Sequence, residues 1–266
     1  MCNGGYICEW GNSMRLRHFG AAIALALSAG AVQAASISVT TFNVGAYNTE
    51  LGTFGPTVTE NFEGYTEGNV GTGQHGAGFE TSVGTFWTMG GTGSGGTVTD
   101  SVAKGNFAGN DGSLLAIRDG NVYGRTSTTA LLTGNASDDK FLDSNDTFGI
   151  KWLVNVGMMF DRLMFTLTDA ADVGARITIE AAGESYSFQG KGNANRQLVL
   201  VNFGGFVDTA TITFFNTDPN TGNPRLNDGF SLDDIAVSVV PLPAPALLLL
   251  AGLGGLAAFR RKRATA

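Results

Sequence analysis

Three aspartates near the end of the central part of the chain are the strongest candidates for metal chemistry. Asp228 lies in the turn 227–229, and Asp233 and Asp234 follow in the segment DGFSLDDIAV. Calcium takes roughly six to eight oxygen ligands, which carboxylates and loop carbonyls supply. The spacing does not match an EF-hand, and aspartate is also a common turn former. Two interpretations stay open: a structural Ca²⁺ held by these residues, and ordinary turn chemistry.

Few residues of the sequence indicate catalysis or cofactor binding. Between residues 35 and 240 the single histidine is His75, and one histidine cannot build a His-based zinc site. Both cysteines, Cys2 and Cys8, lie outside that region. The G-x-G-x-x-G matches at 71–76 and 91–96 open no helical pattern, and no G-x-S-x-G elbow frames a serine. We predict no catalytic residue, no cofactor-binding residue and no enzyme, although a pair of acids acting on a glycosidic bond is an alternative.

Alternating apolar residues between 35 and 239 predict strands that would carry these loops. Ile150, Trp152 and Val154 share one strand face, as do Leu163, Phe165 and Leu167 in a later segment, and Asx- and Gly-rich turns separate such runs. No stretch has a convincing helical period. The sequence therefore predicts an all-β fold, an antiparallel jelly-roll-like β-sandwich.

The last predicted strand changes phase in its middle. Phe230 and Leu232 share one face, whereas Ile235 and the apolar residues after it occupy the next, which predicts a β-bulge at Asp233-Asp234. The segment resembles the closing strand of secreted jelly-roll and lectin-like domains, which supports the fold more than any activity.

Two tryptophans in the central part are candidates either for the core or for stacking on sugar rings. Trp152 continues an apolar strand face and is predicted to be core. Trp87 precedes a Gly-rich stretch and could be exposed, but core packing is the preferred prediction for it too.

Charge divides the chain into unlike parts. The whole chain has 16 basic and 23 acidic residues, net −7, and its 15% of charged residues is low. Residues 35–240 hold 10 of the basic and 22 of the acidic residues, so the two ends are cationic. An acidic domain is a poor partner for nucleic acid, because phosphate contacts need clustered Lys and Arg.

The N-terminal part has the pattern of a secretory signal peptide over residues 14–34. A basic start is followed by an apolar run and by Val32-Gln33-Ala34, which predicts cleavage by signal peptidase between Ala34 and Ala35. A buried helix or a membrane anchor is the alternative, but the apolar run is short for a span. Residues 1–13 do not fit the signal, and we interpret them as an upstream extension before a true start at Met14.

The C-terminal part, residues 240–266, combines three features in order. Val240-Pro241-Leu242-Pro243-Ala244 comes first, an uncharged stretch of 14 residues over 246–259 follows, and Arg260-Arg261-Lys262-Arg263 forms a basic cluster. The apolar stretch is marginal for a transmembrane helix, and the basic cluster is expected to stay cytoplasmic.

These features resemble the PEP-CTERM class of sorting signals, in its VPLPA variant. The resemblance covers about a tenth of the chain and implies a transient inner-membrane anchor in a Gram-negative bacterium, recognised near the Pro motif by an exosortase, a membrane-embedded transpeptidase-like enzyme. The alternative is a plain C-terminal anchor that no enzyme processes.

Together these observations predict an exported surface or matrix protein with a non-catalytic structural or adhesive role in an extracellular polysaccharide layer. A lectin-like carbohydrate-binding module is the second hypothesis, and an enzyme that acts on polysaccharide is the third. The expected partners are signal peptidase, an exosortase, the inner membrane and extracellular polysaccharide. No cofactor is predicted beyond the candidate Ca²⁺.

Overall fold

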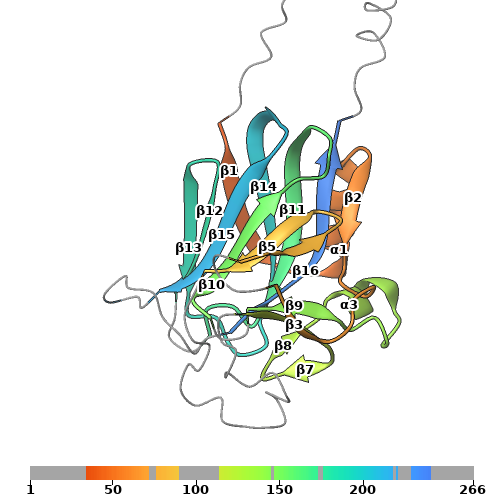
Figure 1. Cartoon of the computed structure of the whole chain (residues 1–266), viewed down its shortest axis with the longest axis vertical. Coiled ribbons are helices and arrows are strands. Elements are labelled where there is room, and N and C mark those ends of the chain that lie inside the picture. The colour runs from red at the N-terminus through yellow and green to blue at the C-terminus, as the bar shows by residue number, and fades with distance from the viewer. Residues whose placement is uncertain are drawn as a thin grey trace, which may run out of the picture. The chain divides into compact units, whose positions relative to one another are not determined.

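The computed structural model describes residues 34–71, 76–89, 114–144, 147–172, 176–217, 220 and 229–240. In this part of the chain two antiparallel sheets pack face to face as a sandwich (Figure 1). The predicted β-sandwich is therefore confirmed.

The first sheet, sheet A, has eight strands in the described part of the chain. Its order is β1 (Ser36–Thr41), β14 (Arg196–Val207), β11 (Phe160–Thr168), β16 (Ser231–Val239), β9 (Phe141–Asp143), β6 (Leu115–Arg118) and β3 (Gly68–Val70), and β2 (Thr57–Glu60) also pairs with β16. The strand β16 thus has β11 on one side along its length and two partners in succession on the other.

The second sheet, sheet B, has six strands among the described residues. Its order is β13 (Glu184–Gln189), β12 (Arg176–Ala181), β15 (Ala210–Thr217), β10 (Gly149–Val154), β5 (Gly84–Thr88) and β4 (Phe79–Thr81). A separate short hairpin is formed by β7 (Asn121–Val122) and β8 (Arg125–Thr126).

The core between the sheets is aromatic and aliphatic, as the period-2 pattern predicts. Trp152 is fully buried and stacks on Phe86, with ring centroids 5.3 Å apart. Phe165 reaches across from sheet A, and its ring centroid lies 4.9 Å from that of Phe214 in sheet B. Burial of such side chains is the main favourable term for a sandwich of this kind.

Two helices among the described residues were not predicted from the sequence, so the fold is mostly β and not β alone. The helix α1 (Val44–Thr53) begins at Asn43, whose side-chain oxygen accepts a hydrogen bond from the Ala46 amide at 2.8 Å, and α3 (Thr129–Thr133) is a short turn of helix. The apolar side of α1 is narrow, because Tyr47 is its one buried residue, so the helical period of its apolar residues is weak.

The helix α1 covers the outer face of sheet A with a second, small core. Phe42, Tyr47 and Phe54 pack there on Met164, Leu198 and Ala236. The segment from β8 through α3 lies over another part of the same face, because Thr126 and Thr128 bond to side chains of β11. Sheet A therefore lies between sheet B and an outer layer of helix and loop.

The predicted bulge in β16 is confirmed. Thr166 faces Asp233 and Met164 faces Ala236, so two residues of β16 oppose one residue of β11. Asp234 has a left-handed backbone with φ of 47°. At this point β16 also changes its other partner from β9 to β2.

The described chain enters and leaves the sandwich at one end. Ser36, the first residue of β1, faces Asn202, which faces Arg162 near the start of β11. Val239, the last residue of β16, faces Phe160, the first residue of β11. Both strand ends accordingly lie at the upper end of the sandwich in Figure 1.

Candidate functional site

The structure buries both aspartates of the bulge beneath the segment that leads into α3. The carboxylate Oδ2 of Asp233 accepts hydrogen bonds from the Ser127 hydroxyl at 2.6 Å and from the Thr128 amide at 2.9 Å. The Asp234 carboxylate accepts from the Thr128 hydroxyl and from the Thr129 hydroxyl, the latter at 2.7 Å. These two side chains therefore hold residues 127–129 against sheet A, and we call the group the bulge clasp.

The backbone of the bulge is bonded as well. The Thr166 hydroxyl donates to the Asp233 carbonyl at 3.1 Å, and the Tyr47 hydroxyl donates to the Asp234 carbonyl at 3.2 Å. The clasp thus connects β16 to β11, to α1 and to α3, which explains why a strained φ is tolerated at Asp234.

Burial dominates the electrostatics of the clasp. It raises the pKa of Asp234 to about 6, against the lowering effect of the Thr128 and Thr129 hydroxyls. It also raises the pKa of Asp233 well above its usual range, and the neighbouring Asp234 carboxylate adds to that shift. Two adjacent acids removed from water cannot both ionise without cost.

The clasp satisfies three of the four carboxylate oxygens of Asp233 and Asp234. Asp233 Oδ2 and both Asp234 oxygens accept from hydroxyl or amide donors, whereas Asp233 Oδ1 is buried without a hydrogen-bond partner. No group of three acidic, His or Cys side chains among the described residues could hold a metal. The third predicted ligand, Asp228, lies outside those residues. Calcium here stays a prediction: a lower melting temperature in EDTA would support it, and an unchanged one would count against it.

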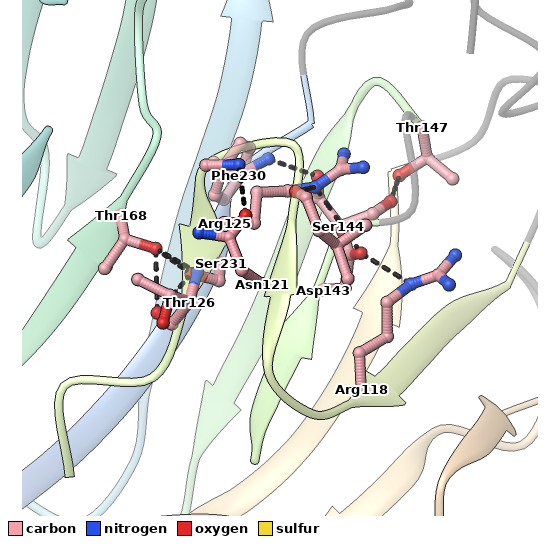
Figure 2. A network of polar contacts seen from close by, with 12 residues as sticks. Arg118, Asn121, Arg125, Thr126, Asp143, Ser144, Thr147, Thr168, Phe230 and Ser231 are labelled. Carbon is pink, nitrogen blue, oxygen red and sulfur yellow. Dashed lines mark hydrogen bonds and ion pairs between the residues drawn. The ribbon is translucent and has the colours of Figure 1, made fainter. Parts of the chain in front are cut away.

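A second buried polar cluster, which sequence reasoning missed, lies where β6, β8 and β9 meet (Figure 2). The Asp143 Oδ2 atom is 2.7 Å from Nε of Arg118 and 3.6 Å from Nε of Arg125, and all three side chains are almost fully buried. The next residue, Ser144, accepts a hydrogen bond from the Phe230 amide at 3.0 Å. Asp143 therefore links the β7–β8 hairpin and β6 to the strand beside β16.

Asp169, directly after β11, is another buried acid. Its Oδ1 accepts a hydrogen bond from the Ala194 amide at 2.7 Å, and its φ is 57°. Burial raises its pKa to about 7, with Asp172 adding to the shift, while the Ala194 amide and the Arg125 charge oppose it. A Cβ at Gly124 would lie 2.5 Å from this carboxylate, so only glycine fits there.

Glu60 and Glu67 lie in or near loops and are candidates for the pair of acids that hydrolysis of a glycosidic bond would need, but each has another partner. The Glu60 carboxylate accepts hydrogen bonds from the Phe62 amide at 3.0 Å and from the Ser82 hydroxyl at 2.9 Å. A hydrogen bond to Asp119 raises the pKa of Glu67. Carboxyl groups in direct contact are closer than the roughly 5–10 Å that glycosidases use, so this pair does not have hydrolase geometry.

Trp87 lies on the outer face of sheet B, so the preferred prediction that it packs in the core is wrong. Its neighbour Phe86 faces the core, and alternation turns Trp87 the other way, half-buried. Its indole N–H donates to the Gly76 carbonyl at 3.1 Å, and the Lys151 ammonium lies 5.9 Å from the ring centroid.

The register of the strands places three further side chains in line with Trp87 across the outer face of sheet B. Trp87 faces Lys151, Lys151 faces Thr213, and Thr213 faces Glu180. The Thr213 hydroxyl donates to Glu180 at 3.3 Å, and both Lys151 and Glu180 are exposed. We call these four residues the sheet B row; an aromatic ring, an ammonium, a hydroxyl and a carboxylate in line are groups that sugars bind.

The predicted processing residues that the structure describes lie at the end where the chain enters and leaves the sandwich. Ala34 is exposed and Ala35 half-buried, immediately before β1. Val240 follows β16, and its amide donates to the Met159 carbonyl at 2.8 Å. The rest of the sorting motif, Pro241, Leu242, Pro243 and Ala244, lies outside the described residues, as do the basic cluster, His75 and both predicted terminal helices. No helix within the described ranges has the length and apolar character needed to cross a membrane.

Comparisons with known proteins give no relative that would assign a function. No family model matches the chain, and no curated protein matches it. Among solved structures it is similar to the "Crystal structure of Agl-KA catalytic domain", with 13% identity, a TM-score of 0.22, and coverage of 38% of this chain and 22% of that one. A similarity this low supports no inference about activity.

Proposed function

We propose that this chain is an exported bacterial surface protein that its C-terminal segment holds at the inner membrane until an exosortase processes it. The released sandwich then has a non-catalytic structural or adhesive role in an extracellular polysaccharide layer. The observation that carries the proposal is that β1 begins and β16 ends at the same end of the sandwich.

That arrangement suits a protein that is attached to the membrane first by its N-terminal signal peptide and then by its C-terminal segment. Ala34-Ala35 and Val240 flank the two strand ends, so signal peptidase and an exosortase would both act at one end of the sandwich. The opposite end, with the β7–β8 hairpin and the bulge clasp, would then point away from the bilayer.

We also propose that strands β9 to β16 form a jelly roll. The order β14-β11-β16-β9 in sheet A against β13-β12-β15-β10 in sheet B supports it, because consecutive strands then alternate between the sheets, apart from the β12–β13 hairpin within sheet B. This scaffold needs no catalytic machinery, and the buried acids Asp143, Asp233 and Asp234 are held by hydrogen bonds or ion pairs within the fold.

The test of sorting is mass spectrometry of the protein's C-terminus in the native host and in a host without its exosortase. We expect loss of residues beyond the Val240–Ala244 motif only where the enzyme is present. Substitution of Pro241 and Pro243 by alanine should prevent that loss. An intact C-terminus in both hosts would contradict sorting and favour a plain anchor.

A second candidate function, glycan binding, is favoured by the sheet B row. The half-buried Trp87 could stack on a sugar ring while Lys151 and Glu180 bond its hydroxyls. On a glycan array, Trp87→Ala should abolish a selective signal, whereas Tyr123→Ala, an exposed aromatic on the β7–β8 hairpin, should not. A wild-type protein with no selective signal would contradict this candidate and leave the structural role.

A further inference from the structure

The end of the sandwich from which the chain leaves exposes large apolar side chains. Met158 and Met159, between β10 and β11, are 43% and 42% exposed, and Phe206, near the end of β14, is 57% exposed. Met158, Met159, Thr209 and Val240 are among the residues that line a pocket of about 440 Å³. We call this set of exposed side chains and the pocket the exit face.

Exposure alone does not distinguish this end from the other. Val44, Tyr123 and Leu131 are also exposed apolar side chains, and the first and last of these line a pocket with Arg196, at the opposite end of the same strands. A partner for the exit face must therefore be argued from the connectivity of the chain.

The length of chain between the exit face and the apolar stretch is small. Val240 is bonded to Met159, and the apolar stretch begins at Ala246. The five residues between them can span at most about 18 Å when fully extended. An apolar stretch inserted in a bilayer would thus keep the exit face within that distance of the lipid surface.

The shortness of the apolar stretch reduces that distance further. As a helix, its 14 residues would be about 21 Å long, whereas the hydrocarbon core of a bilayer is about 30 Å thick. Hydrophobic mismatch is relieved when flanking residues move into the interface. The residues available on the domain side are the uncharged 241–245, and drawing them in brings the exit face against the headgroups.

The exposed side chains of the exit face suit the apolar–polar interface of a bilayer more than they suit charged lipid headgroups. Exposed Met and Phe side chains mark a surface that gains from apolar contact. Charged groups at this end of the sandwich include Asp161, Asp208, Glu184 and Arg162. The Arg162 guanidinium packs on the Phe54 ring, 4.7 Å from its centroid. Anionic lipid would therefore add nothing.

We infer that, before processing, the exit face rests on the surface of the inner membrane, with Met158, Met159 and Phe206 in contact with the lipid interface. This rests on the membrane-anchoring step of the proposed function. It adds that the folded domain itself contacts the bilayer, which holds the Val240–Ala244 motif at the depth where a membrane-embedded enzyme would meet it.

The test uses the full chain with Cys2 and Cys8 replaced by serine, which leaves no other cysteine. An environment-sensitive fluorophore is attached at Thr209→Cys on the exit face or, as the control, at Leu131→Cys at the opposite end. The proteins are reconstituted into phosphatidylethanolamine–phosphatidylcholine vesicles that contain a lipid with a headgroup nitroxide. We expect quenching to be several-fold stronger at 209 than at 131, and unchanged when phosphatidylglycerol is added.

A matched variant separates contact from simple tethering. Met158→Asp with Met159→Asp should lower the quenching at 209 toward that at 131, while the protein still floats with the vesicles. Flotation with equal quenching at 209 and 131 would overturn the inference and leave anchoring intact. Blue-shifted emission at 209 without nitroxide quenching would show that a protein neighbour, such as a second copy, covers the face, and would also overturn it. Failure to float would refute the anchoring step, and with it the proposed function.

Discussion

Buried acids are the residues whose chemistry responds most to pH in this sandwich. Asp169 and Asp234 have raised pKa values of about 7 and about 6 because burial disfavours their charged forms. In the unfolded chain such acids titrate near 4. Between pH 4 and pH 7 the folded protein therefore binds more protons than the unfolded chain, so these groups make the protein less stable as pH rises through that window.

Asp169→Asn should remove the loss of stability that ionisation of the buried Asp169 carboxyl causes as pH rises. Asparagine retains the oxygen that accepts from the Ala194 amide and tolerates the left-handed φ, so the geometry is preserved. We expect the variant to be more stable than the wild type by on the order of 1–3 kcal/mol at pH 8 and nearly equal at pH 4. Urea unfolding at both pH values measures this, with exposed Asp208→Asn as the control; a variant less stable at pH 8 would contradict it.

At the scale of elements, buried polar side chains join pieces of chain that the sheets alone do not connect. The bulge clasp fixes the entry to α3 on sheet A, and Asp143 fixes β6 and the β7–β8 hairpin to β9. Removal of one partner of a buried polar pair lowers the free energy of unfolding by more than the bond itself contributed. The remaining group is then buried with neither its partner nor water to bond to.

Thr128→Val tests the clasp. The change removes a hydroxyl that donates to Asp234 and lies 2.6 Å from the Thr166 hydroxyl, with little change of shape. We expect a loss of about 1–3 kcal/mol in the free energy of unfolding, measured with urea. Thr211→Val, at an exposed position of β15, should change stability by less than about 0.5 kcal/mol. Equal effects of the two changes would show that the clasp does not hold the segment.

Asp143→Asn tests the buried ion cluster. The substitution removes the negative charge between two buried guanidinium groups, so we expect a loss of about 3–5 kcal/mol or failure to fold. The matched control is Asp161→Asn, whose partner Arg162 lies 3.9 Å away in a solvent-exposed pair, for which we expect about 0–1 kcal/mol. Thermal unfolding of both variants makes the comparison, and a loss below that of the control would mean that Asp143 does not bind the hairpin.

Across the complete sandwich, β16 joins most of sheet A, and it ends at Val239, directly before the predicted sorting motif. It pairs with β11, β9 and β2, so the strand closes the sandwich as well as leading to the exit face. A protein cut after its last strand should stay folded, whereas one cut within that strand should not.

Truncation tests this requirement. A chain that ends at Val240 retains every β16 pair and the bond to Met159, and we expect its melting temperature to stay within a few degrees of the full chain. A chain that ends at Asp234 lacks the pairs to β2 and should fail to fold in circular dichroism and proteolysis. A folded product from the shorter chain would contradict the closing role of β16.

Local alternation was enough to predict many of the strands, the core face that includes Trp152, and the bulge in β16, because side chains alternate along a strand and a phase break is visible without knowledge of its neighbours. The sequence also showed the unlike charge of the termini and the central part. It missed α1, whose one buried residue makes a weak helical pattern.

The pairing of the polar groups, in contrast, follows from the three-dimensional fold. Asp233 bonds Ser127, 106 positions away in the chain, and Asp143 meets Arg118 through the pairing of β6 with β9. Likewise, the sheet B row depends on the register of four strands. Such contacts arise from strand order and register, which no local pattern encodes, since a shift of one residue would turn every side chain to the other face.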